Sequence, residues 1–226
     1  MMNKLKILAI PFIFACNIVC AQQFGAHVGT SFSYFTDDFN LKGGNPGLLI
    51  GGLVNYPISD AILLTGGLDY LQISGSIDNT PTFTNNGALW LKESNITIHT
   101  IEASAYGAYK LPLSFLGDAA PYVMGGLSIG YVAGAWDRFE TKQILNDGIL
   151  TFKGNENVKA LVTEWLPAWN VGLRFQSPLD GGLFTQMVLD FRLRSSFDPA
   201  FNTFPLNGSV ALPGARSVSA SLGFFF

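Results

Sequence analysis

The chain ends on Arg216-Ser217-Val218-Ser219-Ala220-Ser221-Leu222-Gly223-Phe224-Phe225-Phe226. Small or polar residues alternate with apolar ones along this stretch, and the last residue is aromatic. Alternation with a period of two predicts a β-strand with one apolar and one polar face. An alternating strand with an aromatic end is typical of a transmembrane β-barrel, where the last strand pairs with the first and no backbone edge meets lipid. We expect Leu222, Phe224 and Phe226 to form the signal for a barrel-assembly machinery.

The first 21 residues have the pattern of a secretory signal peptide. Lys4 and Lys6 precede an apolar stretch, and Val19-Cys20-Ala21 places small residues before a cut after Ala21. The apolar stretch is shorter than the roughly 20 residues that a spanning helix needs. A lipoprotein leader is the alternative, since Ile13-Phe14-Ala15-Cys16 loosely resembles a lipobox. We expect a signal peptide over residues 1–21 and a single barrel domain over residues 22–226.

The composition fits a chain in contact with lipid. Charged residues make up only 13% of the sequence, and mean hydropathy is +0.30. Both cysteines precede the expected cut, so the mature chain offers no disulfide or thiolate site. After the cut, 11 basic residues stand against 16 acidic ones, and no basic patch indicates binding of nucleic acid.

Eight segments alternate between apolar and polar residues. They cover residues 24–34, 48–56, 62–74, 101–110, 121–136, 169–176, 185–194 and 216–226. In the clearest of them, Trp169, Val171, Leu173 and Phe175 alternate with Asn170, Gly172, Arg174 and Gln176. The alternation slips near Ile98 and His99, which indicates a β-bulge or the rim of the barrel. The sequence therefore predicts an all-β fold, an eight-stranded antiparallel up-and-down barrel.

One segment has a second interpretation. Gly126, Gly130 and Gly134 recur every four residues within a stretch without charges, which is the spacing of a helix dimer interface. The same glycines share one face of a strand. The seven other alternating segments favour the strand.

The connecting segments alternate in length. Those near residues 57–60, 111–120 and 177–182 are short, and the longest covers residues 137–167. Short turns on one side and long loops on the other are typical of bacterial outer-membrane barrels, whose long loops are extracellular. We expect the outer membrane of a Gram-negative cell, with lipids and lipopolysaccharide around the barrel.

A set of short motifs resembles the PorT-like outer-membrane β-barrel family of Bacteroidetes over residues 22–226. The motifs are Gly67-Leu68-Asp69-Tyr70, Ile101-Glu102, Tyr109-Lys110, Pro121-Tyr122, Gly125-Gly126, Asn170-Val171-Gly172, Asp190-Phe191-Arg192 and Leu222-Gly223-Phe224. The chain departs from the family at Ala103-Ser104, where Ile-Pro is common, and lacks an aromatic-glycine pair after Arg192. The resemblance implies a small barrel, and the namesake of the family is linked to protein secretion.

The inward positions of these strands carry charged residues, which we expect to form a structural network. They are Asp69, Glu102, Arg174, Asp190, Arg192 and Arg194, with Lys110 near the periplasmic mouth. An eight-stranded barrel is only wide enough for its own side chains, and a buried charge without a partner costs several kcal/mol. We expect the three arginines to meet Glu102 and Asp69 and to close the lumen. The alternative is that some of these charges face headgroups or water.

Aromatic residues gather toward the segment ends, as in the interfacial belts of membrane proteins. They are Tyr34, Phe35, Tyr56, Tyr109, Tyr122, Trp136, Trp169, Phe197 and Phe224. A stacking platform for sugars or bases is the other interpretation.

From the sequence we expect no enzymatic activity. His27 is expected on the inner face near Ser31 and Ser33, and His99 near Thr97 and Glu102, but spacing alone indicates no catalytic triad. Asp37-Asp38 lacks the rhythm of a calcium loop, so we expect no cofactor and no metal.

We expect a small outer-membrane barrel with a filled, closed lumen and a structural or interaction role. Protein partners would bind at extracellular loops within residues 75–95 and 137–167. An accessory role in protein secretion and a lipid-modifying enzyme are the alternatives.

Overall fold

The computed structural model describes residues 22–36, 44–83, 89–113, 118–145, 148–180, 182–201 and 214–226. The expected signal peptide, residues 1–21, lies outside the described residues. The elements are β1 (Gln23–Thr36), β2 (Asn45–Pro57), β3 (Ile62–Phe83), β4 (Leu89–Lys110), β5 (Ala120–Leu145), β6 (Gly148–Asn157), the 3-10 helix η1 (Lys159–Leu161), β7 (Trp165–Pro178), β8 (Gln186–Pro199) and β9 (Gly214–Phe225).

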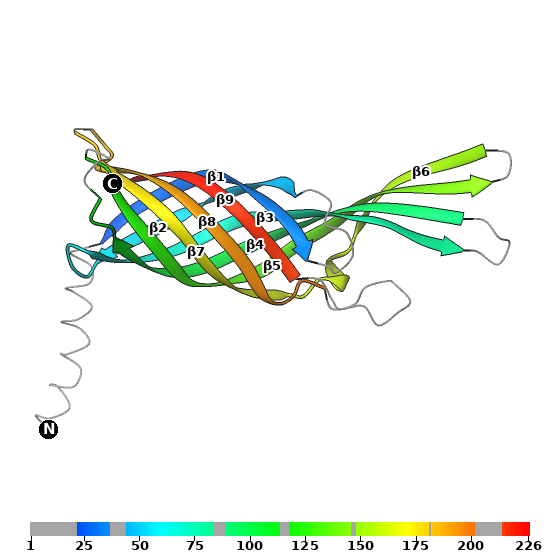
Figure 1. The fold of residues 1–226 in the computed structure, drawn as a ribbon, viewed down its shortest axis with the longest axis horizontal. Helices are drawn as coiled ribbons and strands as arrows, with labels where there is room; N and C mark the ends of the chain where they lie inside the picture. The colour runs from blue at the N-terminus through cyan, green and yellow to red at the C-terminus, as the bar shows by residue number, and fades with distance from the viewer. Residues whose placement is uncertain are drawn as a thin grey trace, which may run out of the picture.

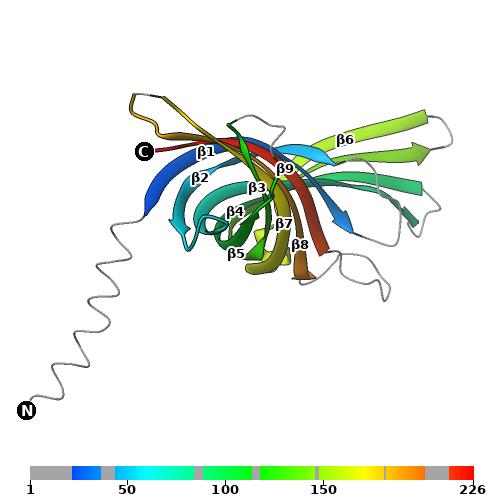
Figure 2. The ribbon, with the colours of Figure 1, turned by 60° about the vertical axis from the view of Figure 1, so that its left-hand side comes forward.

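Eight of these strands close into an antiparallel barrel (Figures 1 and 2). The order runs from β4 through β3, β2, β1, β9, β8 and β7 to β5, and β5 pairs with β4. The closing pair joins the first and last strands, from Gly25 opposite Phe225 to Thr36 opposite Gly214. The predicted eight-stranded up-and-down barrel is confirmed.

Side chains alternate between an outer and an inner face in every barrel strand. On β1, Phe24, Val28 and Phe32 are about half exposed, whereas His27 and Ser31 are buried. This is the period-two pattern of a strand with a different environment on each face.

The recurring glycines belong to β5, which excludes the helix interpretation of this stretch. No helix in the described part of the chain is long and apolar enough to span a membrane. Gly126 faces inward, where an added Cβ atom would clash with the carbonyl oxygen of Ala105. Neighbouring Gly125 faces outward with no atom within 4 Å of such a Cβ. The glycine at 126 is therefore required by close approach to β4.

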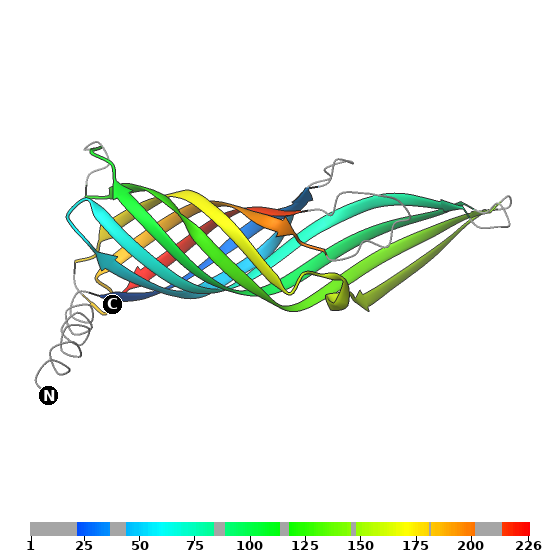
Figure 3. The same ribbon diagram turned by 90° about the horizontal axis from the view of Figure 1, so that it is seen from below.

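Three strands and β6 continue beyond the barrel as a projecting sheet (Figure 3). β3, β4 and β5 contain 22, 22 and 26 residues, and β6 pairs with the far part of β5, from Trp136 opposite Asn157 to Leu145 opposite Gly148. The predicted loops over residues 75–95 and 137–167 are thus largely strand where they are described. Hydrogen-bonded pairing of β3, β4 and β5 simply continues past the end of the shorter strands.

The register shift expected near Ile98 and His99 is confirmed. β4 and β5 pair His99 with Gly134 but Thr100 with Val132, so Ala133 is an extra residue on β5. β4 itself keeps its alternation, because Ile96, Ile98, Thr100 and Glu102 are all buried on the inner face. The bulge therefore lies on β5, and the slip seen in the sequence of β4 reflects the apolar side chains of Ile96 and Ile98 on its inner face.

Gly126→Ala should destabilise the barrel, because the new methyl group meets backbone of β4 and overpacking costs about 1–3 kcal/mol. The midpoint of heat unfolding on a semi-native gel measures the effect. Gly125→Ala, facing outward into open space, is the matched control and should leave the midpoint unchanged. Equal midpoints for both variants would contradict the assigned faces.

Candidate functional site

The middle of the lumen holds a layer of ion pairs built from the six predicted charged residues. All six side chains are buried. Arg174 pairs with Asp190, Arg192 with Asp69, and Arg194 with Glu102. Three arginines thus face three carboxylates, so this layer is neutral by internal pairing.

Arg174 forms the tightest of these contacts. Its Nε and Nη2 donate to the two carboxylate oxygens of Asp190, both at 2.7 Å, in the forked geometry that makes such pairs strong. Nη1 donates to Asn55 Oδ1 at 3.1 Å and to Thr65 Oγ1 at 2.9 Å. The expectation that Arg174 meets Glu102 or Asp69 was wrong, since Asp190 lies directly opposite it on β8.

Arg192 and Arg194 reach from β8 across the lumen to β3 and β4. Asp69 and Glu102 face each other in register, so their like charges would destabilise this strand pair without counter-ions. Arg194 Nε donates to Glu102 Oε2 at 2.7 Å, and Arg192 Nη1 contacts Asp69 Oδ2 at 3.4 Å. These two pairs tie opposite walls of the barrel together.

His27 and Ser221 complete the layer. His27 Nε2 lies 2.7 Å from Asp69 Oδ1, and Nδ1 lies 3.2 Å from Ser221 Oγ. The expected neighbour Ser31 instead donates to the carbonyl of Gln72, at 2.8 Å. Serine, histidine and aspartate are the residue types of a nucleophilic triad, but here each of the three is at most 4% exposed, within the ion-pair layer.

Tyr106 and Asn170 are lumen residues that belong to no predicted site. Arg192 Nη1 donates to the Tyr106 hydroxyl at 2.9 Å, and Asn170 Nδ2 donates to Ser128 Oγ at 2.9 Å. Their inward positions were visible in the alternation of the sequence. Their partners lie on other strands, so no local pattern could have indicated them.

An apolar plug covers the ion-pair layer at the end that carries the projecting sheet. It is a cluster of buried residues from the inner faces of seven strands and from segments next to η1 and after β8: Phe35, Leu49, Leu71, Ile73, Ile96, Ile98, Val132, Ala135, Val158, Val162, Leu166, Ala200, Phe201 and Ala215. Phe35 and Phe201 meet edge to face at 5.1 Å between ring centroids, so the expectation of Phe35 in an interfacial belt was wrong. Smaller clusters at the opposite end include Leu53 with Phe225 and Leu63 with Met124.

The outer face of the barrel is apolar, in contrast to the ion-pair layer inside. Its large apolar side chains are exposed around the whole circumference, for example Leu68 on β3, Leu127 on β5, Leu193 on β8 and Val218 on β9. A closed ring of strands with an apolar outside and a polar, charge-paired inside satisfies its backbone internally and its side chains only in a bilayer. The protein is an outer-membrane β-barrel.

The chain resembles known structures in fold, at low sequence identity. No protein-family model matches the chain, and no curated protein matches it. Among solved structures, the chain is similar to Neisserial surface protein A, at 14% identity over 90% of this chain and 97% of that one, with a TM-score of 0.44.

Two further solved structures are similar to a comparable extent. The attachment invasion locus protein Ail of Yersinia pestis, in complex with the heparin analogue sucrose octasulfate, is 11% identical over 91% of this chain and 99% of that one, with a TM-score of 0.41. A major outer membrane protein from Thermus thermophilus is 12% identical over 91% and 100%, with a TM-score of 0.44.

His99 lies on the outer face, opposite to Glu102. Its Nδ1 contacts the Tyr70 hydroxyl, and Glu102 faces the lumen. The expected proximity of His99 and Glu102 was therefore wrong, because the two residues lie an odd number of positions apart on one strand. Within the described residues, no three His, Cys, Asp or Glu side chains gather as metal ligands. Asp37-Asp38 falls outside the described residues.

Charged side chains brace the projecting sheet. Lys153 on β6 lies opposite Glu140 on β5, with Nζ 2.8 Å from Glu140 Oε2, and Lys142 Nζ lies 3.5 Å from Oε1. The contact with Lys153 lowers the pKa of Glu140, and the same contact raises the pKa of Lys153. On the other face, Lys92 Nζ lies 3.2 Å from Asp137 Oδ2 and over the ring of Phe139.

Glu102→Gln should lower the heat needed to unfold the barrel, because it leaves the Arg194 charge buried without its counter-ion. Removing one partner of a buried pair costs about 3–5 kcal/mol. The midpoint on a semi-native gel measures the loss, with Glu93→Gln on the projecting sheet as the control, since the Glu93 side chain is partly exposed. An unchanged transition for Glu102→Gln would remove the ion-pair layer from the account of stability.

The β5–β6 pairing should weaken in acid. Glu140 has a lowered pKa, so its contribution is present at neutral pH and is lost as the pH falls through that lowered pKa. Hydrogen-exchange protection factors of residues 148–157 measure the pairing. Glu140→Gln is expected to abolish this dependence on pH, and an acid-sensitive variant would contradict the assignment to Glu140.

Proposed function

We propose that the protein is a non-conducting outer-membrane barrel that presents its projecting sheet to a partner outside the cell. The projecting sheet supports this proposal. A barrel that served only to cross the membrane would have no need of strands that continue well past it (Figure 3).

The outer strand of the projecting sheet has the properties of a binding edge. Among the described strands β6 is the last of the sheet, with β5 as its neighbour. Ile149, Leu150 and Phe152 are 48–64% exposed near its tip. Open edges and exposed apolar side chains are the features through which sheets add a strand from a partner.

The interior supports a closed lumen. The ion-pair layer and the apolar plug fill successive levels, and two arginines span the lumen between opposite walls. The side chains of an eight-stranded barrel suffice to fill it. The burial of Ser221, His27 and Asp69 supports a structural role for them over a lipid-modifying activity.

We further propose a family, an export route and membrane partners for this chain. The motifs quoted above support membership of the PorT-like family, and with it an accessory role in secretion; loss of secreted cargo from a deletion strain would favour that role. The pattern of residues 1–21 supports cleavage after Ala21 and export. The paired, aromatic end of β9 supports recognition of Leu222, Phe224 and Phe226 by the barrel-assembly machinery, and the outer apolar belt supports contact with lipids and lipopolysaccharide.

The purified protein should show no steady conductance in a planar bilayer, because the ion-pair layer and the apolar plug fill the lumen.

A photo-crosslinking residue at Leu150 on intact cells should capture an extracellular protein. The same residue at Leu183, which is 73% exposed at the other end of the barrel, is the matched control. A steady open channel, or equal capture at both positions, would contradict the proposal.

A further inference from the structure

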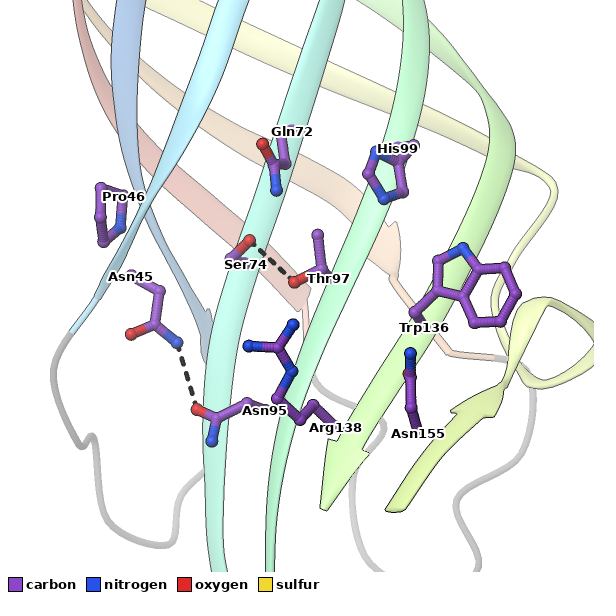
Figure 4. A pocket seen from close by; sticks show the side chains of 10 residues that line it. All are labelled: Asn45, Pro46, Gln72, Ser74, Asn95, Thr97, His99, Trp136, Arg138 and Asn155. Carbon is purple, nitrogen blue, oxygen red and sulfur yellow. Dashed lines mark hydrogen bonds between the residues drawn. The ribbon is translucent and has the colours of Figure 1, made fainter. Parts of the chain in front are cut away.

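A groove on the outer face lies where the projecting sheet leaves the barrel. We call it the outer-wall groove, and it has a volume of about 610 Å³. It is lined by Asn45, Pro46, Gln72, Ser74, Asn95, Thr97, His99, Trp136, Arg138 and Asn155 (Figure 4). Five strands, β2 to β6, contribute to it, so it exists only in the assembled sheet.

At the level of the groove, the side chains of the outer face change from apolar to polar. Farther from the projecting sheet on the same strands, Leu68, Ile101 and Ile129 are exposed and apolar. At the level of Ile98 and Ala135 the inner face is apolar, whereas the outer face becomes polar. The outer wall therefore passes from the hydrocarbon region to the headgroup region at this height.

The groove offers the groups that bind sugars. Side-chain amides and hydroxyls are prearranged by their own contacts: Ser74 Oγ donates to Thr97 Oγ1 at 3.2 Å, and Asn45 Nδ2 donates to Asn95 Oδ1 at 3.4 Å (Figure 4). Each amide keeps further donors or acceptors for a ligand. Trp136, 45% exposed, supplies a flat apolar ring beside them, and such a ring can cover the apolar face of a sugar.

Arg138 adds a positive charge to this polar surface. Its guanidinium extends over the groove in Figure 4. None of the ion pairs found among the described residues includes Arg138. A guanidinium without a carboxylate partner is suited to forked hydrogen bonds with a phosphate.

We propose that the outer-wall groove binds a phosphorylated saccharide, held by Arg138 at the phosphate and by Trp136 and the amides at the sugar. The position at the headgroup level assigns the source to the glycolipid of the outer leaflet. The groove would then be a specific site for the lipopolysaccharide contact proposed above, and this inference rests on the outer-membrane placement.

The test compares single variants reconstituted in vesicles of phospholipid with rough lipopolysaccharide. Trp136→Ala and Arg138→Ala change the groove. Trp169→Ala and Arg216→Ala are matched controls, because both residues are exposed on the outer face of other strands, and Trp169 is 41% exposed. Native mass spectrometry of the extracted barrel measures retained lipopolysaccharide, and delipidated phosphorylated core oligosaccharide serves as a soluble competitor.

The wild-type barrel and both controls should retain lipopolysaccharide, and each groove variant should bind it about tenfold more weakly, the equivalent of about 1.4 kcal/mol. Competition by the soluble oligosaccharide alone, without retention from vesicles, would support the saccharide site and assign a soluble source. Equal retention by all five proteins would overturn the proposal and reduce Trp136 to a member of an interfacial aromatic belt. Failure of the wild type to insert, seen as a lack of heat-modifiable migration, would instead contradict the outer-membrane placement.

Discussion

Pairing between β1 and β9 is the constraint on which the rest of the structure depends. Hydrocarbon offers no partner to a backbone N–H or C=O group, so a sheet within a membrane cannot keep an open edge. The ladder from Gly25 opposite Phe225 to Thr36 opposite Gly214 closes the ring. Once the ring is closed, each residue faces either lipid or lumen, and that division decides which side chains each position accepts.

Closure also determines how the interior is filled. Eight strands leave too little room for a wide aqueous channel, so polar inward side chains must satisfy one another. The ion-pair layer does this with forked and cross-lumen pairs, and the apolar plug above it separates these charges from water on that side. Where the strands leave the bilayer, the need for an apolar exterior ends. The exposed polar side chains of the outer-wall groove and the paired charges of the projecting sheet occupy that region.

Alternation in the sequence was enough to predict the barrel, because successive residues of a strand face lipid and lumen in turn. The position of a residue within its strand therefore decides which side it faces. Alternation was also enough to select Asp69, Glu102, Arg174, Asp190, Arg192 and Arg194 as inward residues. It could not assign partners, since contact depends on height and on the position around the barrel. Arg174 meets Asp190 through strand register, and Arg194 meets Glu102 across the lumen. The projecting sheet was missed because its strands continue without the apolar exterior that revealed the others.

The division into two faces can be measured directly along β8. Spin labels placed one at a time at residues 186–194 of the reconstituted barrel would report collisions with oxygen, which concentrates in hydrocarbon. A strand with one face toward lipid and one toward the lumen predicts maxima at Met187, Leu189, Phe191 and Leu193 and minima at the positions between them. A period near 3.6 residues, the repeat of a helix, or uniform access for a water-soluble reagent, would contradict it.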